Sequence, residues 1–321
     1  MSTSRLLSRY YSFFACGDAV GKATEFMTPQ DISERFGHIT SMPDISKSIT
    51  HSDLPQYAVT DDTEQNLWLL RRYLKDGDVT VENTVDELLK WIDGTGAVEK
   101  HYIGPSSLKA LQGIKNGEDP SFAGINGTTC GGIMRVPAAV FASRILDKDL
   151  DRCICNALIC THNNSIALES AFAYAYALFH ALDNAGNCTT EDLLAKALEG
   201  CRKGMAKAPW ISAGATLEQR LQHICSLNIS SWDEDKLKEF LYGVLGTGLP
   251  SYESSASVFA LLIYTDDPVR TMFLASELGG DTDTIGALAC SLSCVRNLEA
   301  SLPEDIEKPV LEYNRIMEYL G

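Results

Sequence analysis

The stretch "NSIALESAFAYAYALFHAL", residues 164–182, decides the fold class of this chain. It is rich in alanine, and a helix formed from it would carry apolar side chains on most of its faces. A second stretch, "ESSASVFALLIY" at residues 253–264, has the same character with serine added. This composition is typical of helices that pack closely against neighbours on all sides. We therefore expect both stretches to be central helices.

Three further segments have the apolar spacing of amphipathic helices, with one face toward a core. One covers residues 81–92. Another begins at Thr189 or Thr190, and Thr189 stands in capping-box spacing to Asp192. The last covers 309–320 and opens with Pro309, a residue suited to the first helical turn.

Strand patterns are scarce, so the sequence predicts an all-α fold, a compact orthogonal multi-helix bundle. The chain has 321 residues, of which 45% are hydrophobic and 22% are charged. These are ordinary values for a globular protein. No linker rich in proline, serine or glycine divides the chain, so we expect a single domain over residues 1–321.

The net charge of −16 opposes binding to nucleic acid or to anionic membranes, since both need a positive field. The N-terminal stretch lacks a signal-peptide pattern, and no run of about 18 apolar residues occurs. We therefore expect a cytoplasmic protein without a nucleic-acid or membrane partner.

The ten cysteines are expected to be reduced core residues, because the chain is long and carries no secretion signal. Cys153, Cys155, Cys160 and His162 are close enough in sequence to suggest a zinc site. Their spacing is not the paired C-x-x-C of such sites, and the flanking residues resemble a helix. Zinc binding is therefore disfavoured.

Two acidic segments each precede a helix. Thr60, Asp61 and Asp62 stand where an extended segment gives way to a helical pattern, and Asp281 and Asp283 follow a Gly-Gly pair before the apolar stretch "IGALACSLSCV". Helix capping would explain one acidic residue at each place. Two carboxylates and a hydroxyl exceed what a cap needs, so metal binding is the alternative.

Two familiar chemistries with an Asp-x-Asp pattern do not fit the second segment. The nucleophile of haloacid-dehalogenase-type phosphatases follows a buried strand of an α/β domain, whereas Asp281 follows "FLASELGG" in a helical context. An EF-hand loop would need a later glycine and a glutamate at its twelfth position.

If the two acidic segments met in space, at least four carboxylates would share one site. Like charges that close cannot all stay ionised without cations. Because the donors are carboxylate and hydroxyl oxygens, Mg²⁺ or Mn²⁺ would be preferred over zinc or copper.

Six motifs in order carry a resemblance to a known family: "GDAVGKATEF" (17–26), "TDDT" (60–63), "CGGIMRVPAA" (130–139), "CTHNN" (160–164), "YESSASVFALL" (252–262) and "LGGDTDTIGALA" (278–289). Together they closely resemble the ADP-ribosylglycohydrolase family, also called the dinitrogenase-reductase-activating-glycohydrolase-like family. The resemblance spans nearly the whole chain and implies an all-α fold with a central metal-lined cleft.

The resemblance also implies roles for particular residues. Two Mg²⁺ or Mn²⁺ ions would be held by Thr60, Asp61, Asp62, Asp281, Asp283 and Thr284. Glu25 matches a glutamate that ligates a metal or gates the cleft in some relatives. The loop that wraps the diphosphate and ribose, with a histidine beside the bound ligand, would comprise Gly127, Thr129, Cys130, Gly131, Gly132, Met134 and His162.

Three positions in this loop region leave questions open. Thr129 and Cys130 stand where many family members have glycine and asparagine. Arg135 is expected either to form a buried ion pair or to contact the ligand, with the ion pair favoured.

The activity implied is cleavage of the bond between ADP-ribose and an acceptor, with the metals fixing the ribose and activating water, and with Asp62 or Glu25 accepting the proton. The partner would be an ADP-ribosylated protein, with arginine as the favoured acceptor, or a small molecule containing ADP-ribose. Serine-linked, poly- and O-acetyl-ADP-ribose remain alternative substrates. A non-catalytic, crystallin-like member and a metal-dependent nucleotide phosphatase are alternatives from other classes.

Overall fold

The computed structural model describes residues 2–100 and 102–320. Within these residues every regular element is a helix, and the one β-type pairing is an isolated bridge between Thr129 and Pro250. The all-α expectation is therefore confirmed. No described helix is both long and apolar enough to span a bilayer.

The α-helices of the first half of the chain are α1 (Thr3–Gly21), α2 (Pro29–Phe36), α3 (Asp61–Asp76), α4 (Val81–Thr95), α5 (Pro105–Lys115), α6 (Pro120–Ala123), α7 (Val136–Ile145), α8 (Leu150–Leu158) and α9 (Ser165–Asp183). Those of the second half are α10 (Thr190–Lys207), α11 (Leu217–Cys225), α12 (Glu234–Phe240), α13 (Ser251–Tyr264), α14 (Pro268–Ser276), α15 (Thr282–Arg296), α16 (Glu304–Tyr313) and α17 (Ile316–Leu320). Short 3₁₀ and π turns connect them: η1 (Ile45–Lys47), η2 (Gly124–Asn126), η3 (Ile133–Arg135), η4 (Ile229–Ser231) and η5 (Leu241–Leu245).

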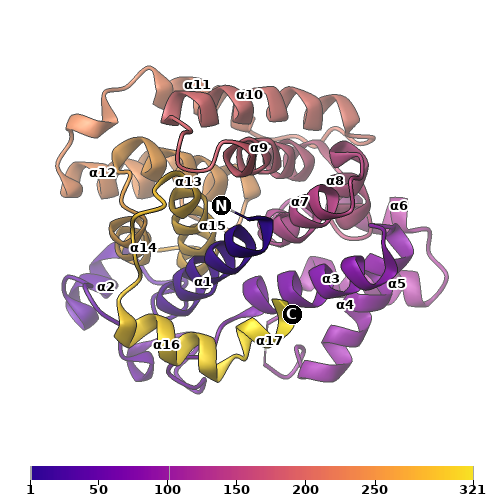
Figure 1. Ribbon diagram of the computed structural model, residues 1–321, viewed down its shortest axis with the longest axis horizontal. Helices are drawn as coiled ribbons and strands as arrows, with labels where there is room; N and C mark the ends of the chain where they lie inside the picture. The colour runs from indigo at the N-terminus through magenta and orange to yellow at the C-terminus, as the bar shows by residue number, and fades with distance from the viewer. Residues whose placement is uncertain (1, 101, 321) are drawn as a thin grey trace.

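Four helices, α1, α9, α13 and α15, form the centre of the bundle (Figure 1). Helix α1 packs along α15, and α9 packs along α10 on one side and α13 on the other. Every residue of α15 from Thr282 to Val295 is buried. The expectation that 164–182 and 253–264 form central helices is confirmed by α9 and α13, whose residues are mostly buried.

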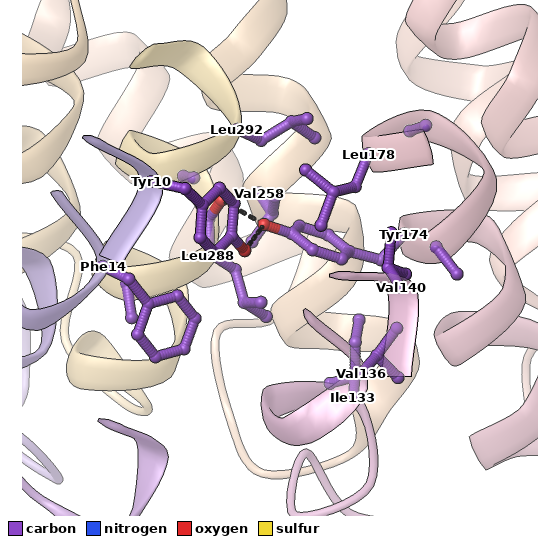
Figure 2. Close-up of a cluster of buried hydrophobic side chains, with 14 of the residues drawn as sticks. Tyr10, Phe14, Ile133, Val136, Val140, Tyr174, Leu178, Val258, Leu288 and Leu292 are labelled. Atoms are coloured by element: carbon purple, nitrogen blue, oxygen red, sulfur yellow. Dashed lines mark hydrogen bonds between the residues drawn. The ribbon is translucent and has the colours of Figure 1, made fainter. Parts of the chain in front are cut away.

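Two tyrosines join three of the central helices inside the core (Figure 2). The Tyr174 hydroxyl of α9 donates to the backbone oxygen of Leu288 in α15 at 2.9 Å. It also shares a 2.7 Å hydrogen bond with the hydroxyl of Tyr10 in α1. Because the proton of Tyr174 goes to Leu288, the Tyr10 hydroxyl must be the donor in this second bond. Both hydroxyls are satisfied although both rings are fully buried, so these bonds fix how the helices lie without leaving an unpaired polar group.

Helices α1 and α15 approach closely because α1 carries a glycine at the contact. A Cβ atom on Gly21 would lie 2.3 Å from the backbone oxygen of Thr282. Only glycine allows this spacing, and it brings the end of α1 against the start of α15.

The amphipathic helices are confirmed at 81–92, which lies in α4, and at Thr189, which caps α10 and forms the expected capping box with Asp192. The start predicted for the last helix is wrong. Pro309 lies inside α16, which begins at Glu304, where carboxylates in the first turn complement the helix dipole. The segment then breaks before α17, where Arg315 has a φ of 54°.

Candidate active site

The two acidic segments meet at one cavity of about 210 Å³. The start of α3 contributes Asp61 and Asp62 to its wall, and the start of α15 contributes Asp281, Asp283 and Thr284. Thr60 lies just behind this wall, with its hydroxyl 3.4 Å from Asp62 Oδ2 and 3.5 Å from Asp283 Oδ2. The structure therefore brings together segments that the sequence separates by more than two hundred residues.

A fifth carboxylate, Glu25, lines the same cavity, and no lysine or arginine is among the described residues that line it. Burial and the charge of Asp283 raise the pKa values of Asp61, Asp62 and Asp281 well above their usual range. Burial likewise raises the pKa of Asp283 to about 6. The group would thus resist full ionisation unless cations were present.

Helix capping does not account for the carboxylates in the cavity. Thr60 does cap α3, since its hydroxyl accepts from the backbone N–H of Asp62 at 3.4 Å. Asp281 holds the cap position of α15 but makes no capping hydrogen bond. Asp281 Oδ2 and Asp62 Oδ1 are both buried without a hydrogen-bond partner. Buried oxygens of this kind fit divalent cations, which bind through oxygen ligands.

A tight turn of two glycines aims the second acidic segment at the cavity. Gly279 and Gly280 have φ values of 75° and 77°, a region that side chains rarely allow. A Cβ atom on Gly280 would also lie 2.3 Å from the backbone oxygen of Thr247. The N–H of Asp281 donates to this same oxygen at 2.7 Å, which fixes the start of α15.

Asp18 of α1 holds the first acidic segment in place, a role that the sequence analysis did not assign. Its carboxylate accepts from the backbone N–H of Thr60 at 2.9 Å and from that of Thr63 at 3.1 Å. The Thr63 hydroxyl donates to it at 2.5 Å. Asp18 is fully buried, so it acts as a cap supplied to α3 by another helix.

Lys22, one turn after Asp18, holds the loop that leads into α3. Its ammonium group donates to the backbone oxygens of Pro55 at 3.1 Å and Gln56 at 3.2 Å, and also to that of Ala58. A sequence signal existed for both residues: Asp18 and Lys22 stand four apart at the end of α1, where the preceding turns are apolar.

His51 is another cavity residue that the sequence analysis missed. Its Nε2 shares a 2.5 Å hydrogen bond with Glu25 Oε2. Burial lowers the pKa of the His51 imidazole, which favours its neutral form. No local pattern marks this histidine, because it stands in a loop and comes to Glu25 only through the fold.

The glycine loop forms another wall of the cavity, through Thr129, Cys130, Gly131 and Met134. The N–H of Cys130 donates to the backbone oxygen of Leu249 at 2.8 Å, so this amide is not free to bind a ligand. The pairing fixes the loop against the start of α13.

Gly127, Gly132 and His162 lie behind the loop and are not among the residues that line the cavity. His162 is fully buried, and its Nε2 lies 3.2 Å from the hydroxyl of Thr129. A Cβ atom on Gly132 would lie 3.0 Å from the side chain of His162. In this geometry His162 supports the loop from beneath.

Arg135 is buried but is held by neutral groups instead of the ion pair favoured from the sequence. It donates to Gln65 Oε1 at 3.3 Å and to the hydroxyl of Thr161. Gln65 in turn donates to Asp61 Oδ2 at 3.2 Å. Arg135 therefore orients Asp61 through Gln65 and is not among the cavity-lining residues.

Eight of the ten cysteines are buried, as expected of core residues, whereas Cys155 is partly buried and Cys225 is exposed. All ten are unpaired, and Cys153 and Cys160 are fully buried. Among the described residues, Cys153, Cys155, Cys160 and His162 do not gather into a group of potential metal ligands.

The raised pKa of Asp283 predicts how the metal-free protein responds to pH. The folded state keeps this proton up to about pH 6, whereas the unfolded chain loses it near the ordinary value of 3.8. Stability should therefore fall as the pH rises through the window from about 4 to 6. In EDTA at pH 7.5, Asp283→Asn should raise the free energy of unfolding by about 2 to 3 kcal/mol. Urea denaturation at pH 4 and pH 7.5 measures this.

The matched control is Asp305→Asn, which removes an exposed carboxylate of α16. It should change stability by less than about 1 kcal/mol. Adding Mn²⁺ should stabilise the wild type more than Asp283→Asn. A lower free energy of unfolding for Asp283→Asn than for the wild type, in EDTA at neutral pH, would contradict this prediction.

Comparisons with known proteins agree with this fold. A sequence model of the ADP-ribosylglycohydrolase family matches residues 5–320. A solved ADP-ribosylglycohydrolase-related protein complex aligns with a TM-score of 0.66 and 25% identity, over 98% of this chain and 98% of that chain. The uncharacterized protein YegU of Escherichia coli K12 is 29% identical over 91% of this chain and 87% of its own length. An uncharacterized protein of Archaeoglobus fulgidus is 24% identical over 90% of this chain and 86% of its own. The chain therefore belongs to the ADP-ribosylglycohydrolase family and is a glycohydrolase.

Proposed function

We propose that the protein is a dinuclear-metal-dependent hydrolase that cleaves the N- or O-glycosidic bond between ADP-ribose and an acceptor, with an arginine side chain as the favoured acceptor. One observation carries this proposal. Five carboxylates line a single cavity, and no lysine or arginine lines it among the described residues. Family membership supports ADP-ribose as the group recognised.

The charge at the cavity supports two ions instead of one. A single divalent ion would offset two of the five carboxylate charges, and a pair would offset four. The ligands would be Thr60, Asp61, Asp62, Asp281, Asp283 and Thr284, with Asp283 between the two sites. Because all of these donors are hard oxygens, Mg²⁺ or Mn²⁺ fits them.

When bound, such ions supply Lewis-acid chemistry that fixes the ribose hydroxyls and acidifies water. The chain itself must then accept a proton from the attacking water. Asp62 is suited to this because its Oδ1 has no hydrogen-bond partner, while its Oδ2 lies beside Thr60. Glu25 is already engaged with His51 through its Oε2. Asp62 is therefore the favoured base, and Glu25 the second candidate.

The glycine loop would hold the diphosphate and ribose against the cavity wall. Thr129, Cys130, Gly131 and Met134 face the cavity, so they would contact the ligand directly. Gly127, Gly132 and His162 would act from behind by keeping the loop in shape. Because no cationic side chain lines this wall among the described residues, backbone N–H groups would have to meet the phosphate charge.

The acceptor preference follows from charge. A guanidinium is positively charged, and two divalent ions would leave one of the five carboxylate charges without a counter-charge, so the loaded cavity would still attract it. A serine or acetyl linkage presents no such charge. At the cavity edge, Phe26 and Leu249 are 48% and 40% exposed, and they offer apolar surface to the stem of an arginine side chain.

A panel of four kinds of ADP-ribose substrate tests the proposed function. The protein is incubated with arginine-, serine- and acetyl-linked ADP-ribose and with poly-ADP-ribose, each with Mg²⁺, Mn²⁺ or EDTA, and products are identified by mass. We expect free ADP-ribose from the arginine linkage with either metal and none in EDTA. Release of inorganic phosphate instead would indicate a phosphatase, and no turnover of any substrate with either metal would refute the enzymatic proposal.

The role of Asp62 gives a separate prediction. Asp62→Asn should lower kcat by about 100- to 10,000-fold, the usual contribution of a general base. Metal content, measured on the same sample by mass spectrometry, shows whether the ions stay bound. Full turnover with both ions present would rule out Asp62 as the base.

The matched control is Glu169→Gln, which changes another buried carboxylate. Glu169 accepts from the backbone N–H groups of Leu217 and Glu218, at the start of α11, and does not line the cavity. Its replacement should lower stability and leave kcat unchanged.

A further inference from the structure

The cavity offers one nitrogen ligand that an all-oxygen metal set does not use. His51 Nε2 and carboxylate oxygens of Glu25 and Asp283 lie within 4.8 Å of one another, and all three residues are buried. An ion that binds its ligands at about 2.1 Å places neighbouring ligand atoms about 3 Å apart and opposite ones about 4.2 Å apart. The three atoms would therefore need only small side-chain movements to surround a single ion.

The backbone that carries the His51 ring is held in position by its own loop. The backbone N–H of His51 donates to the hydroxyl of Ser48 at 3.0 Å, and its backbone oxygen accepts from Leu54 N–H at 3.0 Å. The neighbouring Thr50 hydroxyl donates to the backbone oxygen of Glu25 at 3.1 Å. The loop that carries the imidazole is thus tied to the segment that carries the Glu25 carboxylate.

The edge of the cavity restricts the ring further. The rings of His51 and Tyr102 meet edge to face, with centroids 6.2 Å apart. A ring restricted on two sides loses little freedom when it binds an ion, which favours a ligand role.

An independent observation indicates that this cavity takes a cation. Asp62 and Asp281 line the same cavity and are 2% and 1% exposed. One oxygen of each, Asp62 Oδ1 and Asp281 Oδ2, has no hydrogen-bond partner. A hydrogen bond between His51 and Glu25 would satisfy those two side chains. That hydrogen bond would leave the two aspartate oxygens without any partner, so the His51–Glu25 pair alone does not explain the site.

We propose that His51 ligates one of the two divalent ions through Nε2, together with Glu25 and Asp283, so that this site favours Mn²⁺ or Fe²⁺ over Mg²⁺. Imidazole suits first-row transition ions, whereas Mg²⁺ prefers oxygen ligands and water. This inference rests on the two-ion site of the proposed function. It divides the site into a nitrogen-containing position at His51 and an all-oxygen position at Asp61, Asp62 and Asp281.

Pulsed electron paramagnetic resonance of the full chain loaded with Mn²⁺ alone tests the assignment. Mn²⁺ in the wild type should show coupling to a histidine ¹⁴N nucleus, and labelling the histidines with ¹⁵N should change the coupling accordingly. His51→Gln should abolish it, although the glutamine amide still offers a hydrogen bond to Glu25.

Calorimetric titration with each metal gives the affinities. His51→Gln should lower the affinity for Mn²⁺ by about 10- to 100-fold. Its effect on Mg²⁺ should be less than about threefold, because Mg²⁺ can keep a water in place of the imidazole.

The chain offers a matched control in His38. Its Nδ1 also contacts a buried glutamate, with Glu277 Oε1 at 2.7 Å, but it lines a different cavity. His38→Gln should leave the nitrogen coupling and both metal affinities unchanged.

Mn²⁺ that binds the wild type with oxygen ligands only would overturn the assignment, and this result needs no variant to fold. Hydrolysis of arginine-linked ADP-ribose by the same samples separates the two proposals. Turnover without nitrogen coupling refutes the role of His51 and leaves the proposed function intact. Nitrogen coupling without turnover of any substrate refutes the proposed function alone. A failure of the protein to bind Mn²⁺ refutes the ligand role.

Discussion

Five carboxylates around one small cavity repel one another, and the rest of the structure serves to hold them there. Burial raises the pKa values of Glu25, Asp61, Asp62 and Asp281 well above their usual range, with Asp283 adding its charge in each case. Such an arrangement costs the metal-free protein stability. A protein retains a costly arrangement of this kind where a ligand or a reaction needs it.

The helical core supplies the rigidity that keeps these groups together. Helix α15 is buried along almost its whole length, so its first turn cannot move to relieve the repulsion. Helix α1 packs against it and carries Asp18 and Lys22, which hold the backbone at the entry of α3. The same helix thus supports both acidic segments, directly at α15 and through two buried side chains at α3.

Sequence patterns predicted the features that depend on neighbouring residues. Thr189 as a cap and the apolar stretch of α9 are local, because spacing and side-chain type determine them. Local signals also misplaced the start of the last helix. Pro309 is tolerated inside α16, whose first turn is formed by earlier residues that carry carboxylates. Helix α1 was missed, because its apolar residues merge with the glycine-containing motif at its end.

The candidate site was predictable in part. The two acidic segments stood out by composition, but only the fold brings Thr60 within 3.5 Å of Asp283, across 223 residues. The contact between His51 and Glu25 left no trace in the sequence, because a loop histidine has no periodicity. Whether residues 1–321 form a single domain, and which roles the site residues take, stay predictions.

The central claim is that the segments at 60–62 and 281–284 together bind two divalent ions. Crystals of the protein grown with Mn²⁺, and diffraction recorded on both sides of the manganese absorption edge, locate the ions directly. The account predicts two anomalous peaks in the cavity, each within bonding distance of carboxylates from both α3 and α15. An empty cavity in Mn²⁺-saturated crystals, or peaks confined to the protein surface, would contradict it.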